Sequence, residues 1–402
     1  MKTQRFLIGC LLFASVHTAA AQAGDRTLPR DLTQLSDSLR RLYAPDSRVA
    51  LFNVAYTVAD KNVMLRGETT SAQAKKALLE GLAKAGYTTM DCLRLLPDEE
   101  ALGGKTYAIV NLSVSNLRIE PDFSAEMTTQ ALLGMPVRVL ERKGWYRVQT
   151  PDNYIAWVNG AALCRVSREE LTAWNRAEKV IVTAHYGVVY SQPDAASQTL
   201  SDVVAGNRLK YLSTKGAFFE VAYPDGRTGY ISRSIAQTEK KWRASLRQDA
   251  QSIIQTARTL MGVPYLWAGT SSKGIDCSGL MRTVLYLHDI IIPRDASQQA
   301  YKGERLEIAA DFANLQPGDL LFFGRKATAG GRERVVHVGM YIGGKQFIHS
   351  QGYVQVGSFA KEDPLFDAYN LGRLLFAARI LPHINQGDKE LNTTATNSYF
   401  NL

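Results

Sequence analysis

Hydrophobic positions in the first hundred residues follow two different periods. Leucines at three- and four-residue intervals predict a helix over residues 31–43. Strand-like runs, a second helical pattern and a further apolar run follow, at 49–58, 62–65, 71–85 and 92–96. We therefore expect a small N-terminal α+β domain over residues 24–106.

The next part of the chain repeats its own pattern. Pro121-Asp122 matches Pro193-Asp194, and Gly134 matches Gly206, both at an offset of 72 positions (193 − 121 and 206 − 134). Each repeat has short alternating strands separated by turn residues, which predicts two small β-barrels of the SH3-like kind over residues 107–166 and 179–238. Ser167 and Glu170 have capping-box spacing, so we expect a helix between the barrels.

From residue 241 onward the pattern changes again. A helical apolar stripe ends at Gly262, and a compact mixed region continues to residue 385. The polar stretch 386–402 has no hydrophobic period, so we predict a disordered tail there. The expected architecture is multidomain α+β, with the chemistry in a C-terminal domain over 241–385.

The beginning of the chain resembles an export signal. Lys2 and Arg5 precede an apolar run over residues 6–16, and small residues follow near Ala21. We expect a signal peptide over 1–23 and an exported protein, periplasmic or secreted, with no transmembrane segment. The weaker alternative is lipidation at Cys10, which the hydrophobic run continues past.

Composition narrows the function classes. The chain is 46% hydrophobic and 21% charged, so it can bury cores and is not a disordered polymer. The net charge of +9 comes with no Lys/Arg block, so we expect no nucleic-acid partner. Cleavage of the signal peptide would leave three cysteines, Cys92, Cys164 and Cys277, of which at least one must remain unpaired.

Cys277 is the candidate nucleophile. The apolar residues Leu280, Val284 and Leu287 follow it at helical spacing, so Cys277 is predicted on the first turn of a helix. The partial positive charge and free N–H groups of a helix N-terminus stabilise a thiolate, so we expect a lowered pKa for this thiol. The alternative is that all three cysteines are inert buried side chains.

His337 and His349 are the candidate partners of the thiol. They lie in two apolar runs separated by Gly343-Gly344-Lys345, which predicts a β-hairpin. A two-residue loop would place the imidazoles on opposite faces, whereas a three-residue loop pairs Gly339 with His349 and brings both to one face. We predict the three-residue loop, with His337 as the base and His349 as the group that orients it.

Several ordered motifs in residues 245–382 together resemble the NlpC-type cell-wall cysteine peptidases, which have a papain-like core. The motifs are Pro264-Tyr265-x-Trp267-x-Gly269, Asp276-Cys277-Ser278-Gly279-Leu280, Ile292-Pro293-Arg294-Asp295, Pro317-Gly318-Asp319-Leu320, His337-Val338-Gly339-x-Tyr341-Ile342-Gly343 and Phe347-Ile348-His349. The resemblance implies Cys277, His337 and His349 as the catalytic triad. It also implies that the Tyr265 hydroxyl and the Cys277 N–H stabilise the oxyanion. Ala268, where the family usually has a second glycine, and the insertion around Gly330-Gly331 depart from the family pattern.

Two SH3-type domains before this core resemble one branch, the γ-D-glutamyl-L-diamino-acid endopeptidases acting on free-amine muropeptides. In that branch, residues flanking the nucleophile bind the amine of the N-terminal L-Ala, which implies Asp276 and Ser278 here. A Glu and a Tyr of the first barrel close the end of the site. The best matches are Glu126 and Tyr154, for which a solvated surface role and barrel packing are the alternatives.

We therefore expect a cysteine peptidase that cleaves the γ-D-Glu–diamino acid bond of peptidoglycan-derived peptides with a free N-terminal L-Ala. No cluster of residues has metal-ligand spacing, so neither a metal nor another cofactor is expected, and we expect a monomer. One alternative is an amidase or acyltransferase on the same core. The other is a non-catalytic wall-binding protein.

Overall fold

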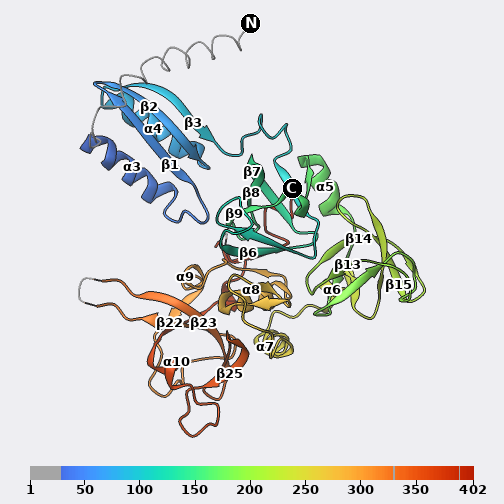
Figure 1. The fold of residues 1–402 in the computed structure, drawn as a ribbon. Helices are drawn as coiled ribbons and strands as arrows, with labels where there is room; N and C mark the ends of the chain where they lie inside the picture. Colours follow the sequence, from blue (N-terminus) through green and yellow to red (C-terminus); the bar gives the residue numbers. More distant parts are fainter. Residues whose placement is uncertain (1–28, 329–330, 389) are drawn as a thin grey trace. The chain divides into compact units, whose positions relative to one another are not determined.

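The structure of the chain is a computed structural model that describes residues 29–328, 331–388 and 390–402. The described part divides into two compact units, one ending at Leu95 and the other running from Leu96 to Leu402 (Figure 1). The predicted signal peptide, 1–23, lies outside the described residues.

The first unit is a three-stranded sheet with two helices. Its strands β1 (Phe52–Ala59), β2 (Asn62–Thr69) and β3 (Thr88–Leu95) lie in the order β1-β2-β3. The β1–β2 pair is an antiparallel hairpin, whereas β2 and β3 are parallel and are joined through α4 (Ala72–Lys84). Helix α3 (Arg30–Tyr43) buries Leu32 and Leu39 in a core shared with α4 and the sheet. The predicted α+β fold is confirmed.

The predicted duplication is confirmed by the topology of two seven-stranded antiparallel sheets. The strands of the first barrel are β4 (Tyr107–Val110), β5 (Val114–Arg118), β6 (Met127–Leu132), β7 (Pro136–Lys143), β8 (Trp145–Gln149), β9 (Ile155–Val158) and β10 (Leu163–Val166). Those of the second are β11 (Lys179–Val182), β12 (Gly187–Tyr190), β13 (Thr199–Val203), β14 (Arg208–Lys215), β15 (Phe218–Ala222), β16 (Thr228–Ser232) and β17 (Ala236–Thr238). The orders β10-β4-β7-β8-β9-β5-β6 and β17-β11-β14-β15-β16-β12-β13 match strand for strand.

The two barrels are joined by helix α5 (Arg168–Arg176), which begins with the predicted capping box of Ser167 and Glu170. The barrels also touch directly. The N–H of Arg208 donates to the carbonyl of Leu133, 2.9 Å away. A Cβ on Gly134, which has a φ of 83°, would lie 2.1 Å from the Arg208 carbonyl oxygen, so this close approach requires glycine.

The C-terminal domain places helices against a six-stranded antiparallel sheet. The sheet order is β21 (Glu304–Leu306), β26 (Leu374–Arg379), β22 (Leu320–Arg325), β23 (Arg334–Gly343), β24 (Gln346–Gln351) and β25 (Tyr353–Ser358). The helices are α6 (Glu239–Ser245), α7 (Ala250–Thr259), α8 (Cys277–Tyr286), α9 (Ala296–Gln299) and α10 (Ala368–Gly372). Two short pairs, β18 (Thr270–Ser271) with β19 (Gly274–Ile275) and β20 (Ile290–Ile291) with β27 (Asn392–Thr393), complete it.

Helix α8 is central to this domain. All ten of its residues are buried, and it shares a hydrophobic cluster with β22, β23 and β24. A helix that is covered on every side must satisfy its polar side chains with partners from neighbouring elements. The partners of its arginine and tyrosine come from the two barrels.

The expectation of a disordered tail over 386–402 does not match the structure. Strand β27 pairs with β20, and Leu391 is fully buried in the core of the C-terminal domain. Most other buried residues of this stretch are polar, including Asn392, Thr394 and Asn397. It is therefore held mainly by hydrogen bonds, and it shows none of the hydrophobic periodicity by which sequence patterns reveal packed elements.

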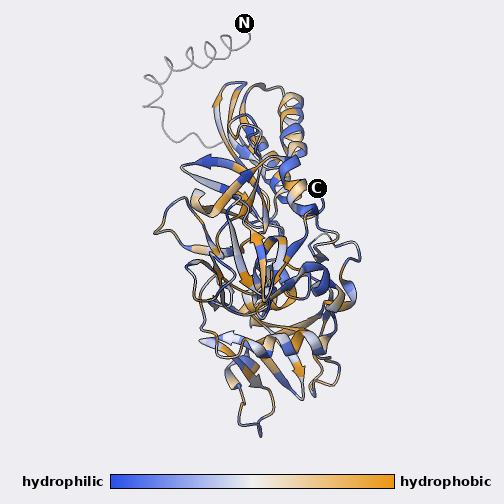
Figure 2. Ribbon diagram, turned by 90° about the vertical axis from the view of Figure 1, so that its right-hand side faces the viewer, coloured by the Kyte–Doolittle hydropathy of each residue, from blue (hydrophilic) through white to orange (hydrophobic). Residues whose placement is uncertain are grey.

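Within the described residues, every helix is too short or too polar to cross a bilayer. Figure 2 shows the corresponding pattern, with hydrophobic and hydrophilic residues mixed along the strands and helices rather than gathered in one long apolar segment.

Candidate active site

The N-terminus of α8 holds Cys277 in a buried setting. Asp276 is the N-cap, and its Oδ1 accepts the N–H of Gly279 at 2.6 Å. The loop that leads to the helix passes so close that a Cβ on Gly279 would lie 2.0 Å from the carbonyl oxygen of Gly269. The glycine after Cys277-Ser278 is therefore required by packing of the loop on the first helical turn.

The thiol of Cys277 differs from the expectation of a lowered pKa. Burial, and then the charge of the Asp276 carboxylate, raise its pKa to about 11. The backbone N–H groups of Val338 and Ser278 donate to the sulfur and oppose this shift without overcoming it. In the free protein at neutral pH the group is a thiol, so attack by this sulfur would require a base to take its proton.

His337 and His349 lie side by side on the sheet beneath this helix. Gly339 pairs with His349, as predicted, and His337 Nε2 lies 2.9 Å from His349 Nδ1. Because Val338 donates its N–H to the sulfur, the thiol lies beside the strand position that follows His337. With Nε2 engaged by His349, Nδ1 is the nitrogen of His337 left for the thiol.

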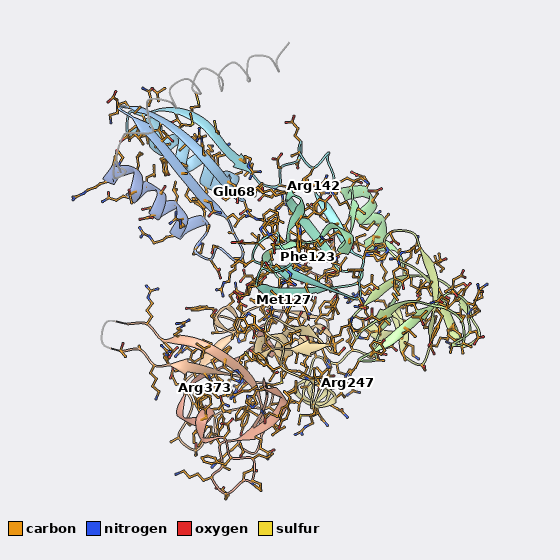
Figure 3. The ribbon with its side chains drawn as sticks, viewed as in Figure 1. Glu68, Phe123, Met127, Arg142, Arg247 and Arg373 are labelled. Atoms are coloured by element: carbon orange, nitrogen blue, oxygen red, sulfur yellow. The ribbon has the colours of Figure 1, made fainter. Side chains whose placement is uncertain are left out.

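Both imidazoles are buried and neutral at pH 7. Burial is the main cause that lowers the pKa of His337 well below its ordinary value, and His349 and Arg373 add to it. Burial also lowers the pKa of His349 to about 4, with Asp367 opposing and Arg373 reinforcing the shift. Figure 3 labels Arg373, which lies between α10 and β26.

The hairpin reaches the predicted pairing of its histidines by a different turn. Gly343 pairs with Gln346 across a two-residue loop, Gly344-Lys345, in which both residues have positive φ. An irregularity between Tyr341 and Gly343 then shifts the register by one residue. The predicted three-residue loop is wrong, but the bulge has the same effect on the register and leaves the two imidazoles on one face.

Tyr265 lies within electrostatic range of the Cys277 thiol. Burial, then the Cys277 thiol and Asp276, raise the pKa of its phenol above the ordinary value, so it stays protonated and can donate a hydrogen bond. Ala268, where the sequence departs from the family pattern, has a φ of 63° and is buried. Its N–H donates to Asp276 Oδ2 at 2.9 Å, so the alanine adopts the conformation that glycine favours.

Asp276 and Ser278 are held by a buried arginine that the sequence analysis did not single out. Arg294 Nη2 donates to Asp276 Oδ2 at 2.6 Å, and Nη1 donates to Ser278 Oγ at 2.8 Å. Arg294 is 1% exposed. Asp276 accepts five hydrogen bonds in all, which occupy all of the roughly four lone-pair positions of a carboxylate. The available signal was the position of Arg294 in one of the motifs that carry the family resemblance, Ile292-Pro293-Arg294-Asp295.

The first barrel brings Glu126 and Tyr154 to loops that flank the nucleophile. Trp267 Nε1 donates to Glu126 Oε1 at 2.8 Å, and Trp267 directly precedes the Ala268 that binds Asp276. Tyr154 is buried, and its hydroxyl lies 3.4 Å from Asp295 Oδ2. Phe123 and Met127, which flank Glu126 in the chain, are labelled on the first barrel in Figure 3.

Buried polar contacts fix this barrel to the helix of the nucleophile. Arg282 of α8 donates through Nε to Asp152 Oδ2 at 2.9 Å and through Nη2 to Asp152 Oδ1 at 3.2 Å. Gln130 of β6 accepts the N–H of Thr270 at 2.8 Å through its side-chain oxygen. The predicted catalytic and substrate-binding residues therefore lie around one site, which is formed by the C-terminal domain and the first barrel.

Two family profiles match these same regions. The NlpC/P60 family matches residues 262–370, and the bacterial dipeptidyl-peptidase SH3 domain matches residues 117–163. A γ-D-glutamyl-L-lysine dipeptidyl-peptidase of Bacillus cereus is 34% identical over 234 residues, covering 56% of this chain and 67% of that protein. A dipeptidyl-peptidase 6 of Lysinibacillus sphaericus is 29% identical over 272 residues, covering 64% of this chain and 94% of that protein.

Solved structures agree with these matches. The crystal structure of an NlpC/P60 family protein from Bacillus cereus has a TM-score of 0.57 and 26% identity, covering 69% of this chain and 100% of that one. An NlpC/P60 endopeptidase from Photobacterium damselae has a TM-score of 0.52 at 13% identity, covering 86% of this chain and 81% of that one, and shares the fold.

Proposed function

Because this chain belongs to the NlpC/P60 family of peptidoglycan-cleaving cysteine peptidases, we propose that it hydrolyses the γ-D-glutamyl–L-diamino acid bond of peptides with a free N-terminal L-Ala. The observation that carries the proposal is the position of Glu126. This barrel carboxylate is bonded to Trp267, next to the loop residue that binds Asp276 beside the nucleophile. A substrate ammonium entering this end of the site would meet a carboxylate partner.

The proposed chemistry is acyl transfer to sulfur. Cys277 Sγ attacks the γ-carbonyl carbon of the D-glutamyl residue while His337 Nδ1 takes the thiol proton. The Tyr265 hydroxyl and the Cys277 N–H donate to the oxyanion of the tetrahedral intermediate. His337 then protonates the departing amine of the diamino acid. A water molecule, deprotonated by His337, attacks the thioester, the C–S bond breaks, and His337 returns the proton to the Cys277 thiolate as L-Ala-D-Glu is released. His349 holds His337 through the 2.9 Å bond between Nδ1 and Nε2.

Within the amine site, Glu126 has the larger part in recognition. Asp276 is buried, paired with Arg294 and saturated with hydrogen bonds, so it has little capacity left for a substrate ammonium. Glu126 is exposed and carries a single negative charge beside Trp267. Asp276 and Arg294 then set the position of the first helical turn, and Glu126 supplies the charge that attracts the ammonium.

We further propose that Tyr154 helps to close the same end of the site. Its hydroxyl approaches Asp295, which directly follows the arginine that holds Asp276. A closed end favours short peptides over intact wall strands, so the proposal includes a role in degrading released wall peptides. It also includes export to the periplasm or beyond, where such peptides arise.

The deciding experiment compares the rates at which L-Ala-γ-D-Glu-L-Lys and its N-acetylated analogue are cleaved. The same comparison is then made with diaminopimelate in place of lysine. We expect rapid release of the diamino acid from the free-amine peptides, slow release from the acetylated ones, and none with Cys277→Ala. Glu126→Gln should raise KM for the free-amine peptide about tenfold with little change in kcat, since a lost charge-assisted bond costs roughly 1.5–3 kcal/mol.

The exposed Glu362, in the C-terminal domain, offers a matched control as Glu362→Gln, which should behave as the parent. Equal cleavage of the free and acetylated peptides by the parent enzyme would contradict the proposed amine recognition. Hydrolysis of a different acyl bond, with the γ-D-glutamyl peptides untouched, would instead support an amidase on the same core.

A further inference from the structure

The segment from Leu391 to Leu402, hereafter the C-terminal segment, contacts both sides of the Tyr154–Asp295 approach. Its residues come after the whole catalytic domain in the chain. They nevertheless reach loops of the first barrel that precede Cys277 by more than a hundred positions. The C-terminal segment has no part in the mechanism described above.

One end of the segment is fixed to the catalytic domain. Strand β27 pairs with β20, Ile290 with Thr393 and Ile291 with Asn392. Next to this pair, Thr394 Oγ1 donates to Asp289 Oδ1 at 2.6 Å. Strand β20 leads directly into Arg294 and Asp295, so the segment is paired with the strand from which the Asp295 loop begins.

The middle of the segment is fixed to the barrel loop that carries Tyr154. Asn397 Nδ2 donates to the carbonyl of Pro151 at 2.9 Å, and both atoms are buried. The Tyr399 hydroxyl donates to Gln149 Oε1 at 3.0 Å. The turn from Thr150 to Tyr154 also has an internal bond, in which the N–H of Thr150 donates to the Tyr154 carbonyl at 3.0 Å.

Further contacts hold the end of the segment against both barrels and the helix between them. Phe400 packs on the core of the first barrel and lies under the guanidinium of Arg208 from the second. Asn175 of α5 donates to the Tyr399 carbonyl at 3.0 Å. The segment therefore spans the catalytic domain, the first barrel, α5 and the second barrel.

We propose that the C-terminal segment positions the Tyr154 loop against the Asp295 loop and so sets the enzyme's preference for substrates with a free amino end. It bonds to the strand that leads into one loop and to the backbone of the other. A displacement of about 1 Å at a site of this kind can lower the rate up to about 100-fold. Small shifts of the barrel loop should therefore change the relative rates at which the two peptides are cleaved. This inference rests on the proposed function for its substrate and on the hydrogen bonds of the segment for its geometry.

The test compares the full-length parent protein with two single-substitution variants and one truncated variant. Asn397→Ala removes the bond to Pro151, together with the bonds of Asn397 to Asn392 and Tyr399 within the segment. Tyr399→Phe removes the bond to Gln149, and truncation after Glu390 removes the whole segment. Ser398→Ala is the matched control, since Ser398 lies between the two anchors and is exposed. Hydrogen–deuterium exchange at the amides of Thr150 and Asn153 reports on the loop without any substrate.

We expect these amides to exchange about tenfold faster in Asn397→Ala than in the Ser398→Ala control, which corresponds to the loss of the one buried hydrogen bond that joins Asn397 to the loop at Pro151. The ratio of kcat/KM for the free-amine peptide to that for its acetylated twin should fall about tenfold, mainly through KM, while alkylation of Cys277 keeps its rate. Tyr399→Phe should act in the same direction with a smaller effect.

Unchanged exchange and an unchanged ratio in Asn397→Ala would overturn the inference and leave the proposed function standing. Equal cleavage of both peptides by the parent enzyme would overturn both. If the truncated chain fails to fold, the two substitutions decide, because both keep the buried Leu391. Tyr399→Phe removes only the bond to Gln149, whereas Asn397→Ala removes the bond to Pro151 and two bonds within the segment, to Asn392 and Tyr399.

Discussion

Arg282 and Asp152 form a buried, doubly hydrogen-bonded ion pair between the helix that begins at Cys277 and the first barrel. The Arg282 guanidinium also donates to the carbonyl of Gln130 at 3.4 Å. The pair connects α8 to the loop that carries Tyr154, so the first barrel and the C-terminal domain share a polar interface.

We predict that Asp152→Ala lowers the free energy of unfolding by about 3–5 kcal/mol, because Arg282 is left buried without its partner. The double variant Asp152→Leu with Arg282→Met should lose less than either single variant, since no charge is left buried. Thermal and chemical unfolding measure both.

Glu307→Ala serves as the control for this prediction. Its carboxylate pairs with Arg305 at the surface, with 78% of the Glu307 side chain exposed, so its loss should cost under about 1 kcal/mol. A loss for Asp152→Ala no larger than that of Glu307→Ala would show that the interfacial pair contributes little.

Substitutions at His337 and at His349 should lower kcat by different amounts. His337→Ala removes the proposed base, and we expect a fall in kcat of at least about 100-fold with KM little changed. His349→Gln keeps a polar side chain beside His337 Nε2 and should retain more activity than His337→Ala. Steady-state kinetics on the free-amine peptide test the order, and the reverse order would exchange the two assigned roles.

Arg294 is predicted to act as a positioning residue through Asp276 and Ser278. Arg294→Lys keeps the charge, but a lysine cannot donate to Asp276 and Ser278 from two nitrogens at once. We therefore expect kcat/KM to fall roughly 10-fold while the chain remains folded. Arg294→Met should destabilise it strongly, because the buried Asp276 carboxylate loses its cation.

The exposed Arg247, labelled in Figure 3, gives the matched control Arg247→Lys, which should leave kinetics and stability unchanged. The rate of Cys277 alkylation adds a second readout, since a shifted Asp276 changes the first turn of α8. Parent-like kcat/KM and alkylation in Arg294→Lys would contradict the positioning role.

Stability should fall as the pH drops below 6.5. Burial lowers the pKa of His349 to about 4, so between pH 6.5 and 4 the unfolded chain binds a proton that the folded chain does not. His337, whose pKa is also lowered, acts in the same direction. The expected slope is up to about 1.4 kcal/mol per pH unit for each histidine.

The difference between the parent and His349→Gln isolates this effect from other titrating groups. The free energies of unfolding of the two proteins, measured at pH 7, 6, 5 and 4.5, should converge as the pH falls. The reason is that the variant lacks one buried neutral imidazole. Parallel losses of stability in the two proteins would contradict the assignment.

Local sequence was sufficient for several features of this protein. The register of Pro121-Asp122 with Pro193-Asp194 revealed the duplication, because matching turn residues recur wherever the same small barrel is built twice. Helical spacing after Cys277 located its helix, and the capping box at Ser167 located another. These signals are short-range, and the residues that make them are neighbours in the chain.

Tertiary structure alone decided the remaining features, because they depend on which distant groups meet. Trp267 and Glu126 are separated by 141 positions, and only packing of the barrel on the catalytic domain places one against the other. The pKa of Cys277 follows from burial and from Asp276 rather than from its helix position, since desolvation outweighs two N–H donors. The segment after Leu391 is ordered by hydrogen bonds to distant loops, which leave no periodic pattern in its own sequence.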